Sequence, residues 1–346
     1  MGKSPYLLVS VLFALAICAG LITPPCLAQT GSWTELENMP TARGYCAAAE
    51  MDGKIYVFGG LFSQEISTDV VEMYDIANGE WTAKNKLPEP MCCMSAVALD
   101  GKIYLVGGSS TFATEAWSRV YEYDPIMDSY TAKPNLPEPR RFLTASVLGD
   151  EIYAIGGFAL DQVYNSVVKY QPSNGTEWVA VAPLNEKRFF SASEVWNGKI
   201  YVIGGAKNTA LYELATMEIF DPATPTAWII SDAELQTGRL MHGSGIVSGH
   251  LFIMGGTSVP DELGSVEQLD LTAGNPAWVS DTPMNSTRRV YAAVEAGGKI
   301  YVAGGISNNT ALNSFHEFTP GFTAVSEMGF LDALIVYPNP ALSSFT

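Results

Sequence analysis

The sequence predicts an all-β protein built from six similar units, and three observations support this. Hydrophobic residues make up 47% of the 346 residues and charged residues only 16%, which is enough apolar surface for a large core. Gly and Pro are frequent, at 32 and 20 residues, and long helical patterns are hard to find. One pattern of short strands and turns recurs six times along the chain, which indicates a stacked supersecondary unit.

The repeated pattern is centred on a glycine pair that follows a strand of the Ile-Tyr-Val type. The intervals between successive pairs are 48, 49, 48, 51 and 49 residues. Glycine can take positive φ and lets neighbouring atoms come close, so we interpret the pairs as structural. The pairs are Gly59-Gly60, Gly107-Gly108, Gly156-Gly157, Gly204-Gly205, Gly255-Gly256 and Gly304-Gly305.

Each unit is predicted to contain four short strands. In the first unit the first two strands span residues 46–51 and 55–58, with Asp52-Gly53 in the tight turn between them. The third strand ends near Tyr74-Asp75, 13 to 15 residues after the glycine pair. A large aromatic residue then marks the fourth strand in the first five units: Trp81, Tyr130, Trp178, Trp228 and Trp278.

A four-stranded sheet of about 50 residues has two apolar faces that it cannot bury alone, and radial stacking into a β-propeller solves this problem. The glycine pairs, the Tyr-Asp and the spaced Trp resemble the kelch family over about residues 33–320. The resemblance implies a six-bladed kelch β-propeller with four antiparallel strands per blade. Trp33, Trp81, Trp178, Trp228 and Trp278 are predicted to fill the space between blades.

The ring is predicted to close through its N-terminal strand. A strand of the fourth type, beginning at Trp33, precedes the first glycine pair. The sixth unit has a poor fourth strand of its own, because Phe322 follows Phe318 after only 4 residues. We therefore expect the Trp33 strand to complete the sixth blade.

The two ends of the chain are predicted to carry export signals. Residues 1–28 read as a signal peptide, with Lys3, an apolar run over 7–22 and a cleavage point at Ala28-Gln29. An uncleaved membrane anchor is the alternative, although the run is shorter than the roughly 20 residues of a spanning helix. Residues 29–328 would form the propeller. The segment 329–346, with Tyr-Pro-Asn-Pro at 337–340, resembles the start of a truncated type IX secretion sorting domain, or else is a Pro-rich linker.

Charge and cysteine content narrow the partners. The net charge of −17 argues against nucleic acid or an anionic membrane surface as the main partner. Cys46, Cys92 and Cys93 remain after signal cleavage, so at least one thiol is free or pairs between chains. Their spacing does not fit a zinc site. We expect a secreted, extracellular or cell-surface monomer without metal, cofactor or transmembrane span.

The candidate ligand site is one mouth of the ring, where the first strand of each unit begins. An arginine stands 17 residues before the second glycine of five pairs, and Met91 takes its place in the second unit. The arginines are Arg43, Arg140, Arg188, Arg239 and Arg288. Two positions later come Tyr45, Cys93, Phe142, Phe190, Met241 and Val290, and His242 lies next to Met241.

Two interpretations of this arginine set remain open. Guanidinium forks bind carboxylates and sulfates bidentately, which would give a mouth for an anionic protein or glycan ligand. The resemblance supports this location, since arginines at the matching position bind acidic peptides in some kelch domains of ubiquitin-ligase adaptors. Alternatively, the arginine belongs to the architecture of the repeat and bonds the carbonyls of the neighbouring loop.

The loops between the second and third strands of each unit lie on the same face and vary most. They span 61–68, 109–117, 158–165, 206–214, 257–264 and 306–313. Variable loops on a rigid scaffold usually carry recognition. The candidate contacts are Phe62, Phe112, Trp117, Phe158, Tyr164 and Tyr212.

Catalysis has little support in the sequence. His242 and His250 lie at opposite ends of one strand, roughly 20 Å apart, and cannot share a metal. A secreted binding module is therefore the first hypothesis, and a purely structural module is a further one. The enzymatic alternative, from the resemblance, is a sialic-acid epimerase (mutarotase) using Arg188, Arg239 and an acid–base group such as His242 or Glu213.

Overall fold

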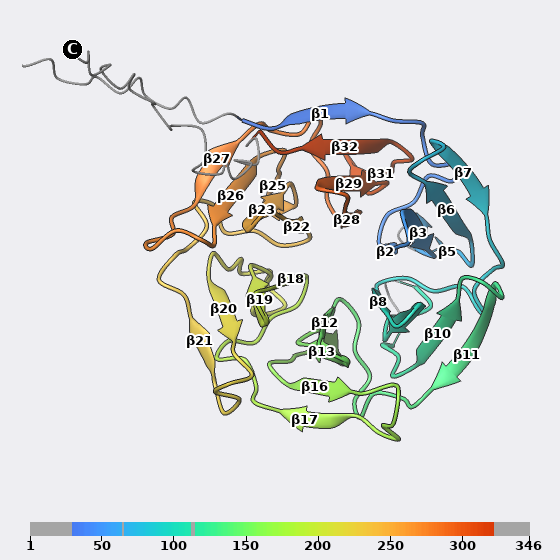
Figure 1. Cartoon of the computed structure of the whole chain (residues 1–346), viewed down its shortest axis with the longest axis horizontal. Helices are drawn as coiled ribbons and strands as arrows, with labels where there is room; N and C mark the ends of the chain where they lie inside the picture. Colours follow the sequence, from blue (N-terminus) through green and yellow to red (C-terminus); the bar gives the residue numbers. More distant parts are fainter. Residues whose placement is uncertain (1–29, 64–65, 112–114, 322–346) are drawn as a thin grey trace, which may run out of the picture.

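Six four-stranded antiparallel sheets surround a central axis in the computed structural model (Figure 1). The structure describes residues 30–63, 66–111 and 115–321, and the predicted signal peptide, sorting segment and Phe112 lie outside these ranges. The predicted six-bladed all-β propeller is confirmed. In the described ranges, no helix is long and apolar enough to cross a membrane.

In the first five blades the strands follow chain order from the axis outward, and in all six blades the innermost strand faces the centre of the ring (Figure 1). The first three blades are β2 (Ala47–Met51), β3 (Lys54–Phe58), β6 (Val71–Asp75), β7 (Glu80–Ala83); β8 (Ser95–Leu99), β9 (Lys102–Val106), β10 (Val120–Asp124), β11 (Ser129–Lys133); and β12 (Thr144–Leu148), β13 (Glu151–Ile155), β16 (Val167–Tyr170), β17 (Val179–Val181). The next two are β18 (Ala192–Trp196), β19 (Lys199–Ile203), β20 (Met217–Phe220), β21 (Trp228–Ile230); and β22 (Gly243–Val247), β23 (His250–Met254), β26 (Val266–Asp270), β27 (Val279–Asp281).

The sixth blade is assembled from both ends of the described chain, as predicted. Its strands are β28 (Ala292–Ala296), β29 (Lys299–Ala303), β32 (Phe315–Thr319) and β1 (Ser32–Glu35). β1 pairs with β32 in the register Trp33 to Phe318. The Trp33 indole nitrogen also donates to the Thr282 carbonyl of the fifth blade at 3.1 Å, so β1 joins two blades.

Hydrogen bonds from tryptophan indoles, which we call latches, connect other blades in the same way. Trp178, Trp228 and Trp278 are buried, and Trp33 and Trp81 are half-buried. Each indole nitrogen donates to a carbonyl of the segment that leads into its blade from the preceding one. The acceptors are Glu37 for Trp81, Pro134 for Trp178, Ala182 for Trp228 and Ala233 for Trp278.

The glycine pairs fix the contact between neighbouring blades. All twelve glycines have positive φ. A Cβ on Gly59 would lie 2.2 Å from the Met91 carbonyl oxygen of the next blade, which excludes any larger residue. The second glycine donates its N–H to this same carbonyl at 2.8 Å, and Gly305 closes the circle by donating to Arg43 at 3.0 Å.

Short hairpins follow the glycine pairs in four blades. They are β4 (Leu61–Ser63) with β5 (Ile66–Ser67), β14 (Phe158–Ala159) with β15 (Gln162–Val163), β24 (Thr257–Ser258) with β25 (Asp261–Glu262), and β30 (Ile306–Ser307) with β31 (Thr310–Ala311). Isolated bridges such as Gly44 to Leu61 and Arg141 to Phe158 tie them to the residues before each first strand. These hairpins therefore surround the predicted mouth.

Candidate functional site

A closed circle of backbone hydrogen bonds runs around this mouth. Its six members, one from each blade, all have positive φ, between 48° and 63°. Each N–H donates to the carbonyl of the member in the preceding blade, at 2.7 to 3.0 Å, and the first member closes the circle by donating to the last. Positive φ is costly for bulky residues, so the mutual hydrogen bonds must offset that strain. The members of this backbone ring are Tyr45, Cys93, Phe142, Phe190, Met241 and Val290.

The side chains of the backbone ring pack on one another. The Phe142 and Phe190 ring centroids lie 4.1 Å apart, and Tyr45 lies 6.1 Å from Phe142. Together with Cys93 and Leu240 they belong to one apolar cluster. A small cavity of about 120 Å³ lies beside them. The structure therefore brings the predicted aromatic residues together, but as a packed apolar cluster at the mouth.

The five predicted arginines do not face this opening. All have side chains that are at most 1% exposed. Four of them donate from Nη1 to the carbonyl of the first glycine in their own blade; for Arg188 and Gly204 this bond is 3.0 Å. The interpretation of an exposed arginine mouth is thus corrected: the guanidinium donors are directed into the blade, as the architectural alternative required.

Three of the arginines also form buried ion pairs with a glutamate in the third strand of their blade. Arg43 contacts Glu72 at 2.5 Å and Arg188 contacts Glu218 at 2.7 Å. Arg239 pairs with Glu267 in the same way. Buried charges are tolerated only when they are paired and hydrogen-bonded, and these pairs meet that condition.

In the remaining blades the partner of the arginine differs, and in one of them the arginine itself is replaced. Arg140 donates hydrogen bonds to Glu138 and Ser166. Arg288 lies 3.2 Å from His316, and burial and the positive charge of Arg288 lower the pKa of that histidine. In the second blade, Met91 replaces the arginine and Tyr121 stands at the glutamate position. The glutamate that recurs in the third strand of three arginine-bearing blades was a sequence signal for a scaffold role, and it was missed.

The predicted acid–base candidates do not form a site with the arginines. Burial, and then the charge of Arg239, lower the pKa of His242 to about 3, so the ring is neutral at physiological pH. A Cβ on Gly204 would approach its Nε2 to 2.7 Å, which places the ring against the neighbouring blade. Glu213 lies in a loop and accepts a hydrogen bond from the Val259 N–H.

The hairpins and loops around the mouth carry exposed apolar side chains. We call this set the crown: Phe62, Ile66, Leu160, Tyr212 and Val259, which are 43 to 76% exposed. Of the predicted loop contacts, Phe62 and Tyr212 are exposed as expected. Trp117, Phe158 and Tyr164 are half-buried and pack against Arg119, Phe189 and Arg140.

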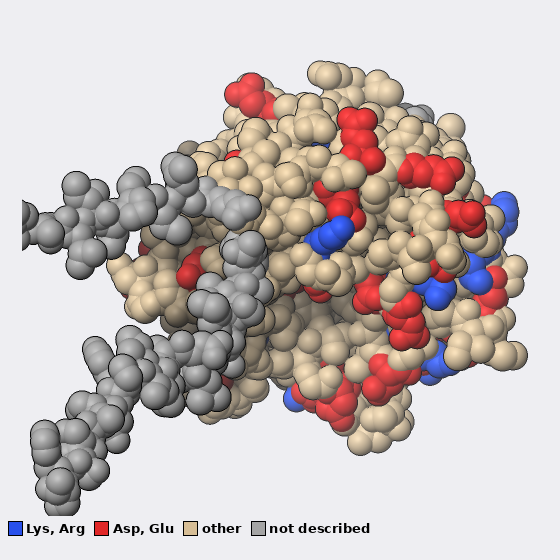
Figure 2. Space-filling model, turned by 45° about the horizontal axis from the view of Figure 1, so that its top comes forward, with Lys and Arg blue, Asp and Glu red and all other residues tan. Residues whose placement is uncertain are grey.

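The charged groups around the molecule are mainly acidic. Figure 2 shows Asp and Glu side chains spread over the visible face, with fewer Lys and Arg between them. Most basic side chains on the blades pair with a carboxylate, as Lys102 does with Asp124 and Lys299 with Glu317. The surface therefore keeps the acidic character of the sequence.

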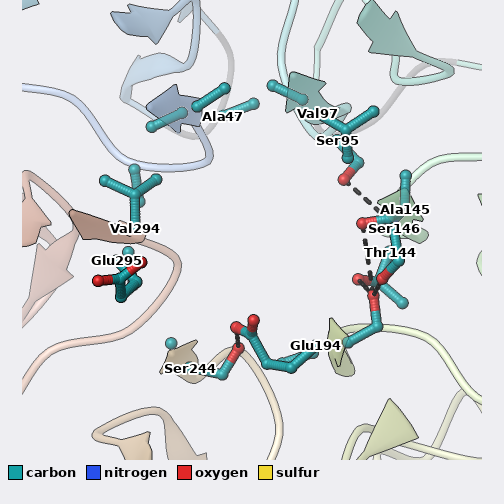
Figure 3. A pocket seen from close by; sticks show the side chains of 18 of the residues that line it. Ala47, Ser95, Val97, Thr144, Ala145, Ser146, Glu194, Ser244, Val294 and Glu295 are labelled. Atoms are coloured by element: carbon teal, nitrogen blue, oxygen red, sulfur yellow. Dashed lines mark hydrogen bonds between the residues drawn. The ribbon is translucent and has the colours of Figure 1, made fainter. Parts of the chain in front are cut away.

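Sequence reasoning did not identify the central channel, which holds a cavity of about 480 Å³. The six first strands line it with mostly small residues, so the axis stays open (Figure 3). One side is polar: the Ser193 hydroxyl lies 2.7 Å from that of Thr144 and 2.6 Å from that of Ser146. Ala47 and Val294 lie on the opposite side, which also carries Glu295 (Figure 3).

Glu194 is the acidic group of the polar side. Burial raises its pKa to about 7, and the negative charge of Glu295 adds to this, whereas the hydrogen bond from Ser244 acts in the other direction. The Ser244 hydroxyl donates to Glu194 Oε1 at 2.5 Å (Figure 3). The signal in the sequence was a glutamate in the middle of a strand that faces the axis.

The fold defines the class of protein, and comparisons with known proteins identify its repeats. A solved structure titled "Structure of YjhT" matches with a TM-score of 0.71 over 81% of this chain and 95% of that one, at 15% identity, which shows a shared fold. The family model of the KLHDC2/KLHL20/DRC7 Kelch-repeats domain matches residues 27–187, and the Kelch motif matches residues 288–322. Residues 27–187 and 288–322 therefore match kelch repeats, within a six-bladed β-propeller.

Two curated proteins of Arabidopsis thaliana are similar to part of the chain. An F-box/kelch-repeat protein is 33% identical over 95 residues, which is 27% of this chain and 24% of that protein. A tRNA wybutosine-synthesizing protein 2/3/4 is 30% identical over 102 residues, which is 28% of this chain and 10% of that protein. The similar region spans only a tenth to a quarter of these relatives.

Proposed function

We propose that the protein is a secreted or cell-surface binding module that recognises a partner protein through the crown. The observation that carries this proposal is the exposure of several apolar tips around one mouth of a rigid ring, with Leu160 76% and Tyr212 64% exposed. Exposed apolar side chains grouped on one face mark interaction surfaces. Loops held by a rigid scaffold commonly supply such contacts.

The chemistry of the crown favours a protein over a glycan. Three of its five members are the aliphatic residues Ile66, Leu160 and Val259. Aliphatic side chains bury apolar protein surface well, but they offer a sugar neither hydrogen bonds nor an aromatic face. The arginines that were expected to bind a carboxylate or sulfate are buried, so they do not supply donors to such a ligand at the mouth.

A peptide and glycan array tests this proposal with a triple variant, Phe62→Ser, Leu160→Ser and Tyr212→Ser. The control is Ile126→Ser with Met127→Ser, since these residues are 88% and 71% exposed in the turn between β10 and β11. We expect peptide hits that weaken at least about tenfold in the crown variant and persist in the control. Hits confined to glycans, or equal loss in both variants, would contradict the proposal.

Export is tested by sequencing the N-terminus of the protein recovered outside the producing cell. Cleavage after Ala28 predicts a mature chain that begins at Gln29. Recovery of the intact N-terminus in the membrane fraction would favour the anchor. A fusion of residues 329–346 to a carrier tests separately whether that segment directs secretion.

The sialic-acid epimerase alternative gains no support from the described residues. Its two arginines are buried in ion pairs, and His242 is neutral and wedged between blades. An enzyme acting on an anionic sugar needs accessible cationic donors. Mutarotation of sialic-acid anomers followed by NMR is the direct measurement, and acceleration abolished by Arg239→Ala would revive this alternative.

A further inference from the structure

The central channel has the dimensions of a ligand site separate from the crown. Its cavity of about 480 Å³ lies among the first strands, and the packed side chains of the backbone ring narrow the axis at the mouth. Pockets of a few hundred cubic ångströms hold small molecules. The small side chains of β2, β8 and β28 keep this space open.

The two sides of the cavity call for different parts of a ligand. One side presents the hydroxyls of Thr144, Ser146 and Ser193, and the Glu194 carboxylate lies next to Ser244 (Figure 3). The opposite side presents alanine and valine side chains, among them Ala47 and Val294, together with Glu295 (Figure 3). A molecule with a polar head and an aliphatic chain complements both sides at once.

The charge of the cavity selects the polar head. Glu50, Glu194 and Glu295 line it, and the lining contains no lysine or arginine among the described residues. In the described part of the chain no basic side chain pairs with Glu194. A cavity of this charge within a protein of net charge −17 repels anions and concentrates cations.

We propose that the central channel binds a small aliphatic amine, with its ammonium group held by the Glu194 carboxylate. An ammonium has three donors and no acceptor, so it can donate to the carboxylate oxygens alongside the Ser244 hydroxyl. The methylene chain then lies along the alanine and valine side. Ser244 orients the carboxylate through its hydrogen bond of 2.5 Å.

Binding is expected to depend on pH, because an ammonium favours the ionised form of Glu194. With the pKa of this carboxyl near 7, about a tenth of it is ionised at pH 6 and nine tenths at pH 8. Affinity should therefore rise about tenfold between these values, while an alkylamine stays protonated throughout. The other titratable groups around Glu194 are Glu50, Glu295, His242 and Tyr201, the cross-strand partner of Glu194. His242 is neutral, and the raised pKa of Tyr201 keeps that residue neutral as well.

Calorimetric titration with n-butylamine tests the site, with butan-1-ol as the uncharged probe of the same length. The amine should bind about tenfold more tightly at pH 8 than at pH 6, and the alcohol should not bind. Equal binding of both probes, or absence of amine binding at both pH values, would overturn the proposal.

Variants locate the site within the chain. Glu194→Gln should weaken butylamine binding at pH 8 at least tenfold and abolish the pH dependence, whereas Glu177→Gln removes one exposed carboxylate outside the channel and should change neither. Unchanged binding in Glu194→Gln would overturn the proposal. If that variant does not fold, Ser244→Ala serves instead: loss of its hydrogen bond raises the carboxyl pKa further, so affinity at pH 7 should fall and recover at higher pH. An unchanged pH profile in Ser244→Ala would contradict the proposed geometry.

Discussion

Around the same mouth lie the crown and the five buried arginines, Arg43, Arg140, Arg188, Arg239 and Arg288, which we call the arginine layer. The two sets differ in exposure and in sequence. The layer repeats one residue type in five blades, and its side chains are at most 1% exposed. The crown uses a different residue at each tip, and its side chains are at least 43% exposed. A position that repeats through most blades serves what the blades share, which is the scaffold. An exposed position that differs between blades is free to serve recognition.

A comparison of the second and fourth blades sharpens this lesson. In the fourth blade, Arg188 and Glu218 form an ion pair whose side chains are both 0% exposed. In the second blade, Met91 is equally buried and Tyr121 packs against its apolar cluster. A buried ion pair can be replaced by well-packed apolar groups of similar volume. The same structural position therefore has an ionic and an apolar solution in one chain.

The largest expected effect comes from deleting residues 29–40, which removes β1 and opens the ring. β32 would lose its outer partner, and the Trp33 latch to the fifth blade would be lost. We expect the melting temperature to fall by about 10 °C or more, given about 2–4 °C per kcal/mol in chains of 150–250 residues. A melting curve identical to that of the mature chain would show that closure by β1 does not stabilise the propeller.

Arg188→Ala should have the next largest effect, because it leaves Glu218 buried without its positive partner. Removal of one member of a buried pair costs about 3–5 kcal/mol in unfolding free energy. The double variant Arg188→Met with Glu218→Tyr copies the second blade and should cost less than the single variant. Urea unfolding measures both. A stable Arg188→Ala variant with impaired ligand binding would show instead that the arginine layer belongs to the ligand site.

The sequence was sufficient to predict the blades and their closure, because glycine pairs and turn residues act locally. Gly59 must accept a carbonyl at close range, and Asp52-Gly53 must turn, whatever surrounds them. The direction of the arginine side chains was not local information. It depends on Glu218 and its equivalents, which lie about 30 residues further along the chain, and a pattern read at one position could not show it.

The channel was missed for a related reason. Glu194 and Ser244 are 50 residues apart, and each looks like an ordinary polar residue of a half-exposed strand. They come within hydrogen-bond distance only because the propeller places their two blades side by side. The crown was predicted as a set of loops, but Phe158 stacks on Phe189 while Tyr212 stays exposed, and that division depends on packing between blades.

Glu194 should also make stability depend on pH, with a smaller effect than the arginine variant. An acid whose pKa is raised to about 7 in the folded state binds more protons there than in the unfolded chain, where the ordinary value is near 4.5. Stability therefore falls as the pH rises from about 4.5 to 7. We expect a loss of about 2 kcal/mol, allowing for solvent in the channel. Unfolding at pH 4.5 and 8 should show this loss in the mature chain and not in Glu194→Gln; an equal loss in the variant would assign it to other groups.

The crown should give the smallest change in stability, although it should have the largest effect on binding. Leu160→Ser and Tyr212→Ser remove exposed side chains, and substitutions at such positions usually change the unfolding free energy by no more than about 0.5 kcal/mol. The matched variant Phe142→Ser replaces a member of the backbone ring that is 7% exposed, and burial of the lost side chain predicts a cost of about 3 kcal/mol. Urea unfolding of the three variants should separate them clearly. If the crown substitutions destabilised the protein as much as Phe142→Ser, the tips would be packing elements like the arginine layer, and the contrast between scaffold and recognition surface would not hold at this mouth.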